Sequence, residues 1–186
     1  MKEYIIGTDY NLSSEGANNL NTQVFLNANQ QVIAELLTFI DFADDKLTIG
    51  FVEINFTQDR ERLIDIIISH IKNQEIQFII LDVSNLEVCY LLDVIVAKLA
   101  NLKIEKDKKL VLLIIGLENS IGRYDEYPPV LQDLNFVRDA YTVSVPHPIL
   151  FILPDYALTR LAKYAPDFWA WRRGVFRFFA IESVSP

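Results

Sequence analysis

The stretch KLVLLII, which runs from Lys109 to Ile115, is the most apolar run of this chain of 186 residues. A second run, IQFIILDV from Ile76 to Val83, is nearly as continuous in apolar character. Strands have this composition when helices cover both faces of a sheet, because neither face then meets water. The two runs therefore predict central strands of a sheet that is buried on both sides.

Shorter apolar runs and helical patterns alternate on either side of these two strands. Leu47–Ile54, Ile149–Leu153 and Gly174–Ile181 predict three further strands, and amphipathic helical patterns separate them. Strands that alternate with helices of about ten or more residues are typical of βαβ units with right-handed crossovers. The predicted fold class is α/β, a three-layer sandwich around a mostly parallel five-stranded sheet.

The composition divides the chain into three parts. Residues 1–30 are rich in Asn, Ser, Thr and Gln and predict a polar N-terminal arm. Residues 31–181 predict the α/β domain, and residues 182–186 a tail or linker. Within the domain, Ser84-Asn85-Leu86-Glu87 has the sequence of a capping box, which predicts that the helix extending to about Ala100 begins there. One continuous helix is expected from about Pro129 to Tyr141.

Charge and cysteine content exclude several classes of function. The formal net charge is -8, and nucleic-acid binding needs clustered Lys and Arg instead, so no nucleic-acid partner is expected. No apolar stretch approaches the roughly 20 residues that span a bilayer, so no membrane partner is expected. The single cysteine, Cys89, permits no disulfide within the chain and is expected to be a packed thiol. These features indicate a cytoplasmic, bacterial-type protein.

The junction between the first strand and its helix decides whether nucleotide phosphates can bind. A phosphate-binding loop has the sequence G-x-x-x-x-G-K-[ST], in which glycines expose backbone N–H groups and the lysine neutralises phosphate charge. Residues Ile54–Arg62 contain neither glycine nor lysine, and they add the carboxylates of Asp59 and Glu61. Arg60 or Arg62 could contact a phosphate, but the sequence favours a capped surface helix and no nucleotide cofactor.

Glu118 follows the third strand, where nucleotide hydrolases place carboxylates that serve Mg²⁺ and water. The usual aspartate is missing, because Ile115 and Gly116 occupy the end of the strand. A single glutamate in a polar loop is more often a solvated turn residue. His70 and His147 have no metal-ligand spacing, so no metal is expected. No nucleophile and base pair is recognisable either, and the sequence favours a protein without catalytic residues.

The segment Ala165–Phe179 is the most distinctive part of the chain, because tryptophan, phenylalanine and arginine gather in it. Trp171, Arg172 and Arg173 predict an interaction surface, since Trp and Arg dominate the energetics of protein interfaces. The alternative is a last strand whose aromatic side chains cover the sheet, with arginines stacked on them. We expect Trp169 to be buried and Trp171 to be partly exposed beside Arg172.

From about Val32 to Phe178 the chain resembles the P-loop-like domains of bacterial STAND-type signalling proteins, which often precede tetratricopeptide repeats. The resemblance lies in Gly116–Ser120, in Leu134–Asp139 and most specifically in Leu150–Phe178. It implies a strand order of 5-1-4-3-2 and a nucleotide-controlled switch that drives the assembly of neighbouring domains. It also implies that Asn135 and Arg138 lie in the region that senses the nucleotide.

Two functions follow from the sequence and the resemblance together. The first is a non-catalytic protein-interaction or regulatory module with a degenerate Walker A loop, whose partners are other protein domains or subunits, downstream repeats of its parent chain, or a second copy of itself. The alternative is a nucleotide-binding switch with an unconventional phosphate loop. In that case Arg60, Glu118, Asn135 and Arg138 form the site.

Overall fold

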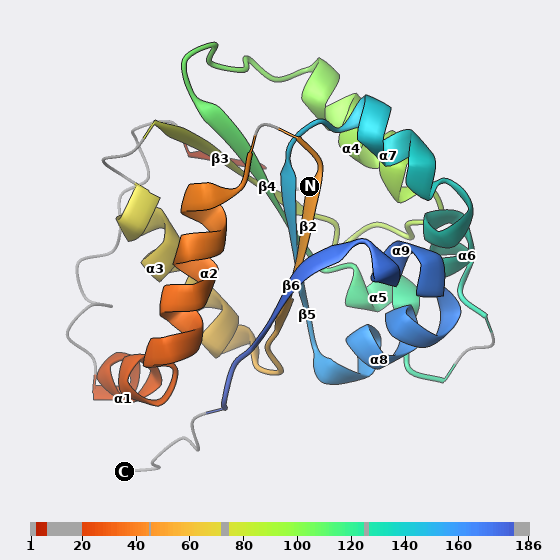
Figure 1. Ribbon diagram of the computed structural model, residues 1–186. Coiled ribbons are helices and arrows are strands. Elements are labelled where there is room, and N and C mark those ends of the chain that lie inside the picture. Colours follow the sequence, from red (N-terminus) through yellow and green to blue (C-terminus); the bar gives the residue numbers. More distant parts are fainter. Residues whose placement is uncertain (1–2, 7–19, 45, 72–74, 125–126, 181–186) are drawn as a thin grey trace.

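Five parallel strands form the centre of the fold (Figure 1). The structure is a computed structural model and describes residues 3–6, 20–44, 46–71, 75–124 and 127–180. The strands lie side by side in the order β3-β4-β5-β2-β6. Counted along the chain from the first parallel strand, this is 5-1-4-3-2 read from the opposite side, so the predicted class and order are confirmed. Their bounds are β2 (Thr48–Glu53), β3 (Ile76–Asp82), β4 (Lys109–Ile115), β5 (Pro148–Leu153) and β6 (Arg172–Arg177).

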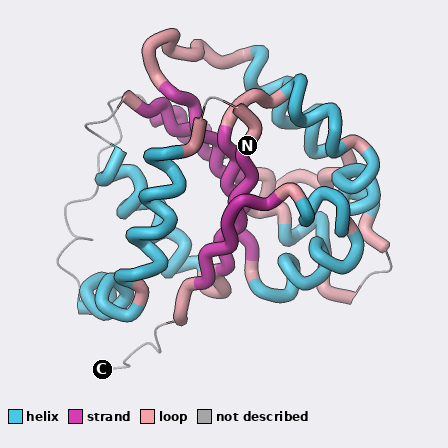
Figure 2. Tube along the Cα trace, in the orientation of Figure 1, coloured by secondary structure: helices cyan, strands magenta, loops and turns pink. Residues whose placement is uncertain are grey.

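Helices cover both faces of the sheet (Figure 2). One face carries α1 (Leu20–Ala28), α2 (Gln30–Phe42) and α3 (Thr57–Ile71). The other carries α4 (Leu91–Ala100), α5 (Glu118–Ile121), α6 (Pro129–Phe136), α7 (Arg138–Ser144), α8 (Asp155–Tyr164) and α9 (Pro166–Ala170).

Side chains of each central strand alternate between the two hydrophobic cores. On β4, Leu112 and Ile114 pack into the core beneath α4–α9, whereas Val111 and Leu113 pack into the core beneath α1–α3. All four are buried, which explains why the strand is apolar at every position instead of at every second one.

The N-terminal segment contributes more to the domain than the sequence indicates. Strand β1 (Glu3–Ile6) pairs antiparallel with β3, and helix α1 follows within the segment expected to be a polar arm. Phe25 of α1 is fully buried and its ring stacks on Phe178 at 5.9 Å. The buried Asn29 exchanges two hydrogen bonds with the backbone of Phe179, which ties the α1–α2 junction to the chain after β6.

Two helix predictions are wrong. Helix α4 begins at Leu91 instead of at the expected capping box, because the loop after β3 is held by α5. Asn119 donates to the Ser84 carbonyl, and the Val88 N–H donates to the Ser120 hydroxyl. The expected helix 129–141 is two helices that meet at Val137.

Strand β6 starts at Arg172, before the predicted Gly174, and ends at Arg177. Of its predicted extent, Ile181 lies outside the described residues, as does the whole predicted tail of residues 182–186.

Candidate functional site

Two loops meet at the carboxyl edge of the sheet, where parallel α/β proteins commonly bind ligands. The first joins β2 to α3 through Ile54–Phe56, and the second leads from β4 to α5. Gly116 in the second loop has φ +84°, and a Cβ atom there would lie within 2.4 Å of the Ser84 backbone nitrogen. Glycine is therefore required, and it lets the β4 loop approach the end of β3 closely.

Arg60 and Glu118, predicted from separate motifs, meet at this edge. The Arg60 Nη1 atom donates to Glu118 Oε1 at 3.1 Å, and both side chains are mostly buried. The Tyr156 hydroxyl of α8 donates to the Glu118 carbonyl at 3.5 Å. Burial raises the pKa of Tyr156, the Glu118 carboxylate raises it further, and Arg123 opposes the shift. The expectation of a solvated Glu118 is wrong, because Arg60 pairs with it.

Other side chains close what remains of the junction. Asp59, in the first turn of α3, is buried and pairs with Arg62. The Asn55 side-chain oxygen accepts the Asp155 N–H at 2.9 Å, which fastens the β2–α3 loop to α8. The hollow left beside Arg60 and Glu118 measures about 40 Å³. Small-molecule pockets usually measure about 300 to 1,000 Å³, so this one is closed to a nucleotide in the described conformation.

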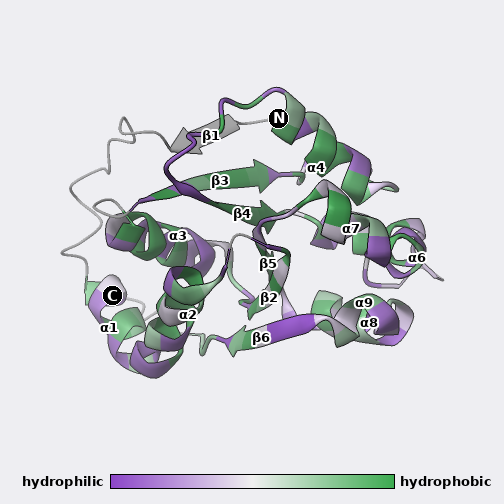
Figure 3. Cartoon of the chain, turned by 45° about the horizontal axis from the view of Figure 1, so that its top comes forward, coloured by the Kyte–Doolittle hydropathy of each residue, from purple (hydrophilic) through white to green (hydrophobic). Residues whose placement is uncertain are grey.

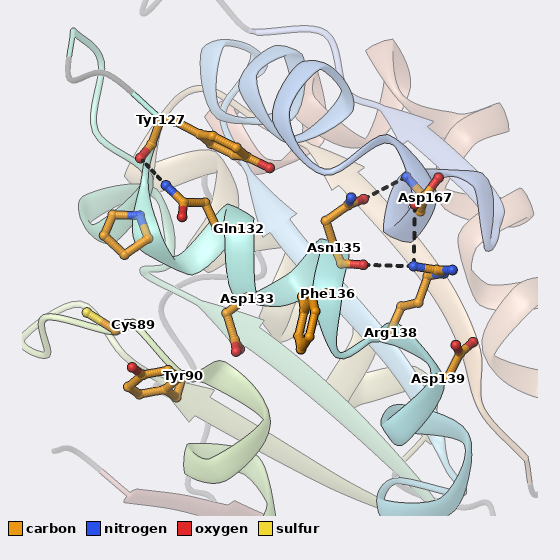
Figure 4. Close-up of a pocket in the computed structure, with 11 residues that line it drawn as sticks. Cys89, Tyr90, Tyr127, Gln132, Asp133, Asn135, Phe136, Arg138, Asp139 and Asp167 are labelled. Atoms are coloured by element: carbon orange, nitrogen blue, oxygen red, sulfur yellow. Dashed lines mark hydrogen bonds and ion pairs between the residues drawn. The ribbon is translucent and has the colours of Figure 1, made fainter.

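Asn135 and Arg138 lie elsewhere, at the junction of α6 and α7 (Figure 4). Arg138 donates to the Asn135 carbonyl at 3.0 Å and forms an ion pair with Asp167 of α9 at 3.3 Å. The Asn135 side-chain oxygen accepts the Asp167 N–H at 2.8 Å. These three residues join α6, α7 and α9. The hollow that they line shares no residue with the one beside Arg60 and Glu118.

That second hollow is a groove of about 830 Å³, within the range of ligand sites. Besides Asn135, Arg138 and Asp167, its walls are formed by aromatic, acidic and thiol side chains that the sequence did not predict as a site. The chief ones are Cys89, Tyr90, Tyr127, Asp133, Phe136 and Asp139. We name this the α6 groove.

The sequence contains a signal for one of these residues. Val130, Leu131 and Leu134 mark the buried face of α6, and Phe136 lies about 200° around the helix from Leu134. The helical period thus predicts an exposed Phe136, and this residue is 86% exposed. Cys89 departs from the expectation of a packed thiol within a helix. It lies in the loop before α4, is half-buried and faces the groove.

Asp133 is the electrostatically perturbed member of the groove. Burial raises the pKa of its carboxyl, and the nearby Asp93 of α4 raises it further. Its Oδ2 atom is buried and has no hydrogen-bond partner among the described residues. Behind it, Tyr141 is fully buried, and burial, with the charges of Asp133 and Asp93, raises its pKa well above the ordinary value.

The predicted interaction residues surround the start of β6, which Figure 3 colours as hydrophilic. Arg172 lies over the Trp169 ring at 4.4 Å and donates to the Trp169 carbonyl, while Arg173 is exposed. Trp169 and Trp171 are both half-buried, so the expected contrast between them is wrong. Phe168, one position earlier, is the fully buried ring. Trp171, Arg172 and Arg173 line a third hollow of about 360 Å³ with Thr142 of α7.

Among the described residues, no group of His, Cys, Asp and Glu side chains could hold a metal ion. Among the described helices, none combines the length and apolar character needed to cross a bilayer.

Comparison with known proteins identifies the fold. No protein-family model matches the chain, and no curated protein matches it. The structure of the Aeropyrum pernix ORC2 protein in ADPNP–ADP complexes is similar, with a TM-score of 0.51 and 11% identity. The similarity covers 87% of this chain and 46% of that one.

Rif2 in complex with the C-terminal domain of Rap1 is similar with a TM-score of 0.50 and 10% identity, over 87% of this chain and 61% of that one. At such identities the similarity concerns the fold alone. This chain has a P-loop NTPase-like fold and spans less than half the length of the ORC2 chain.

Proposed function

We propose that this domain is a non-catalytic protein-interaction or regulatory module of a cytoplasmic bacterial signalling protein, built on a P-loop NTPase-like fold without a functional phosphate loop. The Arg60–Glu118 ion pair is the observation that carries the proposal, because it occupies the junction where such folds hold phosphates. A parent protein of STAND type is part of the proposal. That part rests on the sequence resemblance.

The charges at this junction oppose a nucleotide. For Arg60 to bind a phosphate it would have to leave Glu118, whose mostly buried carboxylate would then face another anion. Like charges in a partly buried place disfavour each other strongly. The N-terminus of a helix usually attracts anions, but the first turn of α3 already carries the buried carboxylate of Asp59.

The alternative is a nucleotide-binding switch with an unconventional phosphate loop. The similar ORC2 structure contains ADPNP and ADP, which favours this alternative, whereas the similar Rif2 structure contains a protein domain. Arg60 and Glu118 line one hollow, and Asn135 and Arg138 line another with no residue in common. A single nucleotide site formed by all four would therefore need a rearrangement of the domain.

Thermal melting in the presence of Mg²⁺ and ATP distinguishes the two functions. A ligand at about 100 times its Kd stabilises a folded protein by about 2.7 kcal/mol. For a chain of this length, that corresponds to a rise of about 5 to 10 °C in Tm. We expect millimolar ATP to leave the Tm of the wild type unchanged. A rise of several degrees that disappears in both Arg60→Ala and Glu118→Ala would establish the nucleotide switch instead.

The interaction surface that we assign to the module contains Trp171, Arg172 and Arg173. Arg173 makes the cleanest test, because it is exposed and its replacement should leave the core intact. Sedimentation velocity at increasing protein concentration measures self-association. We expect Arg173→Glu to shift any concentration-dependent association toward the monomer at an unchanged Tm. Thr38→Glu, which adds a negative charge at an exposed position of α2, is the control and should have no such effect.

A further inference from the structure

The α6 groove presents three exposed aromatic rings around one hollow. Tyr90, Tyr127 and Phe136 are 64%, 44% and 86% exposed. Large apolar side chains gathered at one hollow commonly mark an interaction site, whereas singly scattered ones need no explanation. Figure 4 shows Phe136 and Asp133 extending from α6, with Cys89 and Tyr90 on the segment before α4. The rings and the carboxylate thus share one space.

The formal charge of this groove is negative. Its described lining contains three carboxylates, Asp133, Asp139 and Asp167, and one cation, Arg138, which leaves an excess of two negative charges. Arg138 is already bonded to Asp167 and to the Asn135 carbonyl. Asp93 lies close enough to act electrostatically on Asp133. The lining therefore favours a cationic occupant over an anion such as a nucleotide.

Asp133 provides a specific attachment point for such a cation. Asp133 lines the groove, and its buried Oδ2 atom lacks a hydrogen-bond partner among the described residues, so a rotation of the side chain that brings this atom to the groove surface would let a bound cation satisfy it. A guanidinium group fits this environment better than an ammonium group. It donates parallel hydrogen bonds to a carboxylate and stacks its plane on aromatic rings. Aromatic faces add a cation–π attraction within about 6 Å of a ring centroid.

We propose that the α6 groove binds an arginine side chain presented by a segment of a partner protein. The volume of about 830 Å³ exceeds what one side chain fills, so residues that flank the arginine lie in the groove with it. This inference rests on the proposed function, since it names the chemistry of a partner for the interaction module. It uses a surface other than Trp171, Arg172 and Arg173.

Cys89 allows a direct test on the unmodified protein. It is the only cysteine in the chain and it lines the groove, so its rate of reaction with a thiol reagent reports occupancy. The probe is a blocked Gly/Ser peptide with two arginines. Matched peptides carry citrulline, which keeps the shape without the charge, or lysine. We expect the arginine peptide to slow the reaction at least tenfold in a saturable way, the lysine peptide less, and the citrulline peptide not at all.

Variants connect this protection to the proposed contacts. Asp133→Asn keeps the size of the side chain and removes its charge, and we expect it to weaken arginine-peptide protection about tenfold or more. Phe136→Ala should weaken it severalfold without unfolding, because the ring is exposed. Asp107→Asn, an exposed change in the 101–108 loop, is the matched control, and the arginine peptide should protect its Cys89 as it does in the wild type. Anisotropy of a fluorescein-labelled arginine peptide provides the same comparison if Cys89 reacts too slowly.

Each contrary result has a distinct meaning. Equal protection by arginine and citrulline peptides, or none by either at millimolar concentration, would overturn the arginine site and leave the proposed function standing. Equal protection by lysine would overturn the preference for a guanidinium. Protection by Mg²⁺ and ATP, with none by the arginine peptide, would overturn both this inference and the proposed function.

Discussion

The hollow beside Arg60 and the α6 groove contain similar residue types but differ in how their charges are matched. Beside Arg60, one cation and one carboxylate from different elements pair at 3.1 Å through Glu118 Oε1 and leave a space of about 40 Å³, although the buried Glu118 Oε2 atom has no hydrogen-bond partner among the described residues. In the α6 groove, carboxylates outnumber cations and about 830 Å³ stays open. Paired charges close a site that comparable folds use for phosphates. Unpaired carboxylates keep another site available for a cation.

Both regions depend on β4, whose side chains alternate between the two hydrophobic cores. Leu112 and Ile114 are buried in the core beneath α4–α9. Truncating either to Ala should lower the free energy of unfolding by about 2 to 5 kcal/mol, because the lost contacts and the cavity add together. Urea denaturation measures this. Val143→Ala, which changes a side chain that is 83% exposed, is the control, and a midpoint for Leu112→Ala equal to that control would mean that β4 is not central.

The α6 groove depends on α9, which supplies Asp167 and is anchored by Phe168. Phe168 is fully buried against the rings of Tyr141 and Phe151. Phe168→Ala should therefore destabilise the domain by about 3 to 5 kcal/mol. Trp171→Ala should have a smaller effect, because that ring is half-buried. Chemical denaturation of both variants gives the comparison, and the reverse order would show that Trp171 anchors this segment.

The sequence predicts the sheet better than it predicts either site. A continuous apolar run such as Lys109–Ile115 predicts a central strand directly, since burial on both faces requires apolar residues throughout. The capping box at Ser84 predicts a helix start that the structure does not have. The loop there is held instead by α5, whose Asn119, 35 positions further along the chain, donates to the Ser84 carbonyl. No local pattern contains such a tertiary contact. The α6 groove is assembled from α6, α7, α9 and the loop before α4, so its residues are scattered along the chain.

Arg60 and Glu118 illustrate what the sequence leaves open. Each was predicted as a candidate phosphate or Mg²⁺ contact from its own motif, 58 positions apart. Their pairing follows only from the strand order, which places the ends of β2 and β4 on either side of β5.

The contact between Arg60 and Glu118 predicts that their substitutions are not additive in stability. If Arg60 and Glu118 stabilise each other, the double variant Arg60→Met/Glu118→Gln should be less destabilised than the sum of the two single variants. We expect a coupling free energy of about 0.5 to 3 kcal/mol, the usual range for residues in direct contact. Additive single variants would indicate that the pair contributes nothing to closing the junction.

The α6 groove predicts a smaller effect, a pH-dependent difference in stability between Asp133→Asn and the wild type. Burial and Asp93 raise the pKa of Asp133 in the folded state. A raised pKa stabilises the folded state below the unfolded value, which is about 3.9, and this stabilisation is lost as pH rises through the folded pKa. At neutral pH, Asp133→Asn should therefore gain stability relative to the wild type. That gain should shrink as the pH falls.

Denaturation curves at pH 7 and in mild acid measure this difference. Gln132→Ala, a neighbouring change without a titrating group, provides the reference, and its difference from the wild type should not vary with pH. If the difference for Asp133→Asn is equally constant, Asp133 is not perturbed in the folded protein.

A site-resolved NMR titration tests the contrast between the two regions most directly, and a protein of 21.4 kDa is within its reach. Amide resonances of ¹⁵N-labelled protein would be followed as Mg²⁺ and ATP are added to millimolar concentration. The account predicts that the amides of Asn55–Arg60 and of Glu118 do not shift. Saturable shifts of these amides, absent when ATP is replaced by an equal concentration of sulfate, would contradict it by showing that the Arg60–Glu118 pair opens to admit a nucleotide.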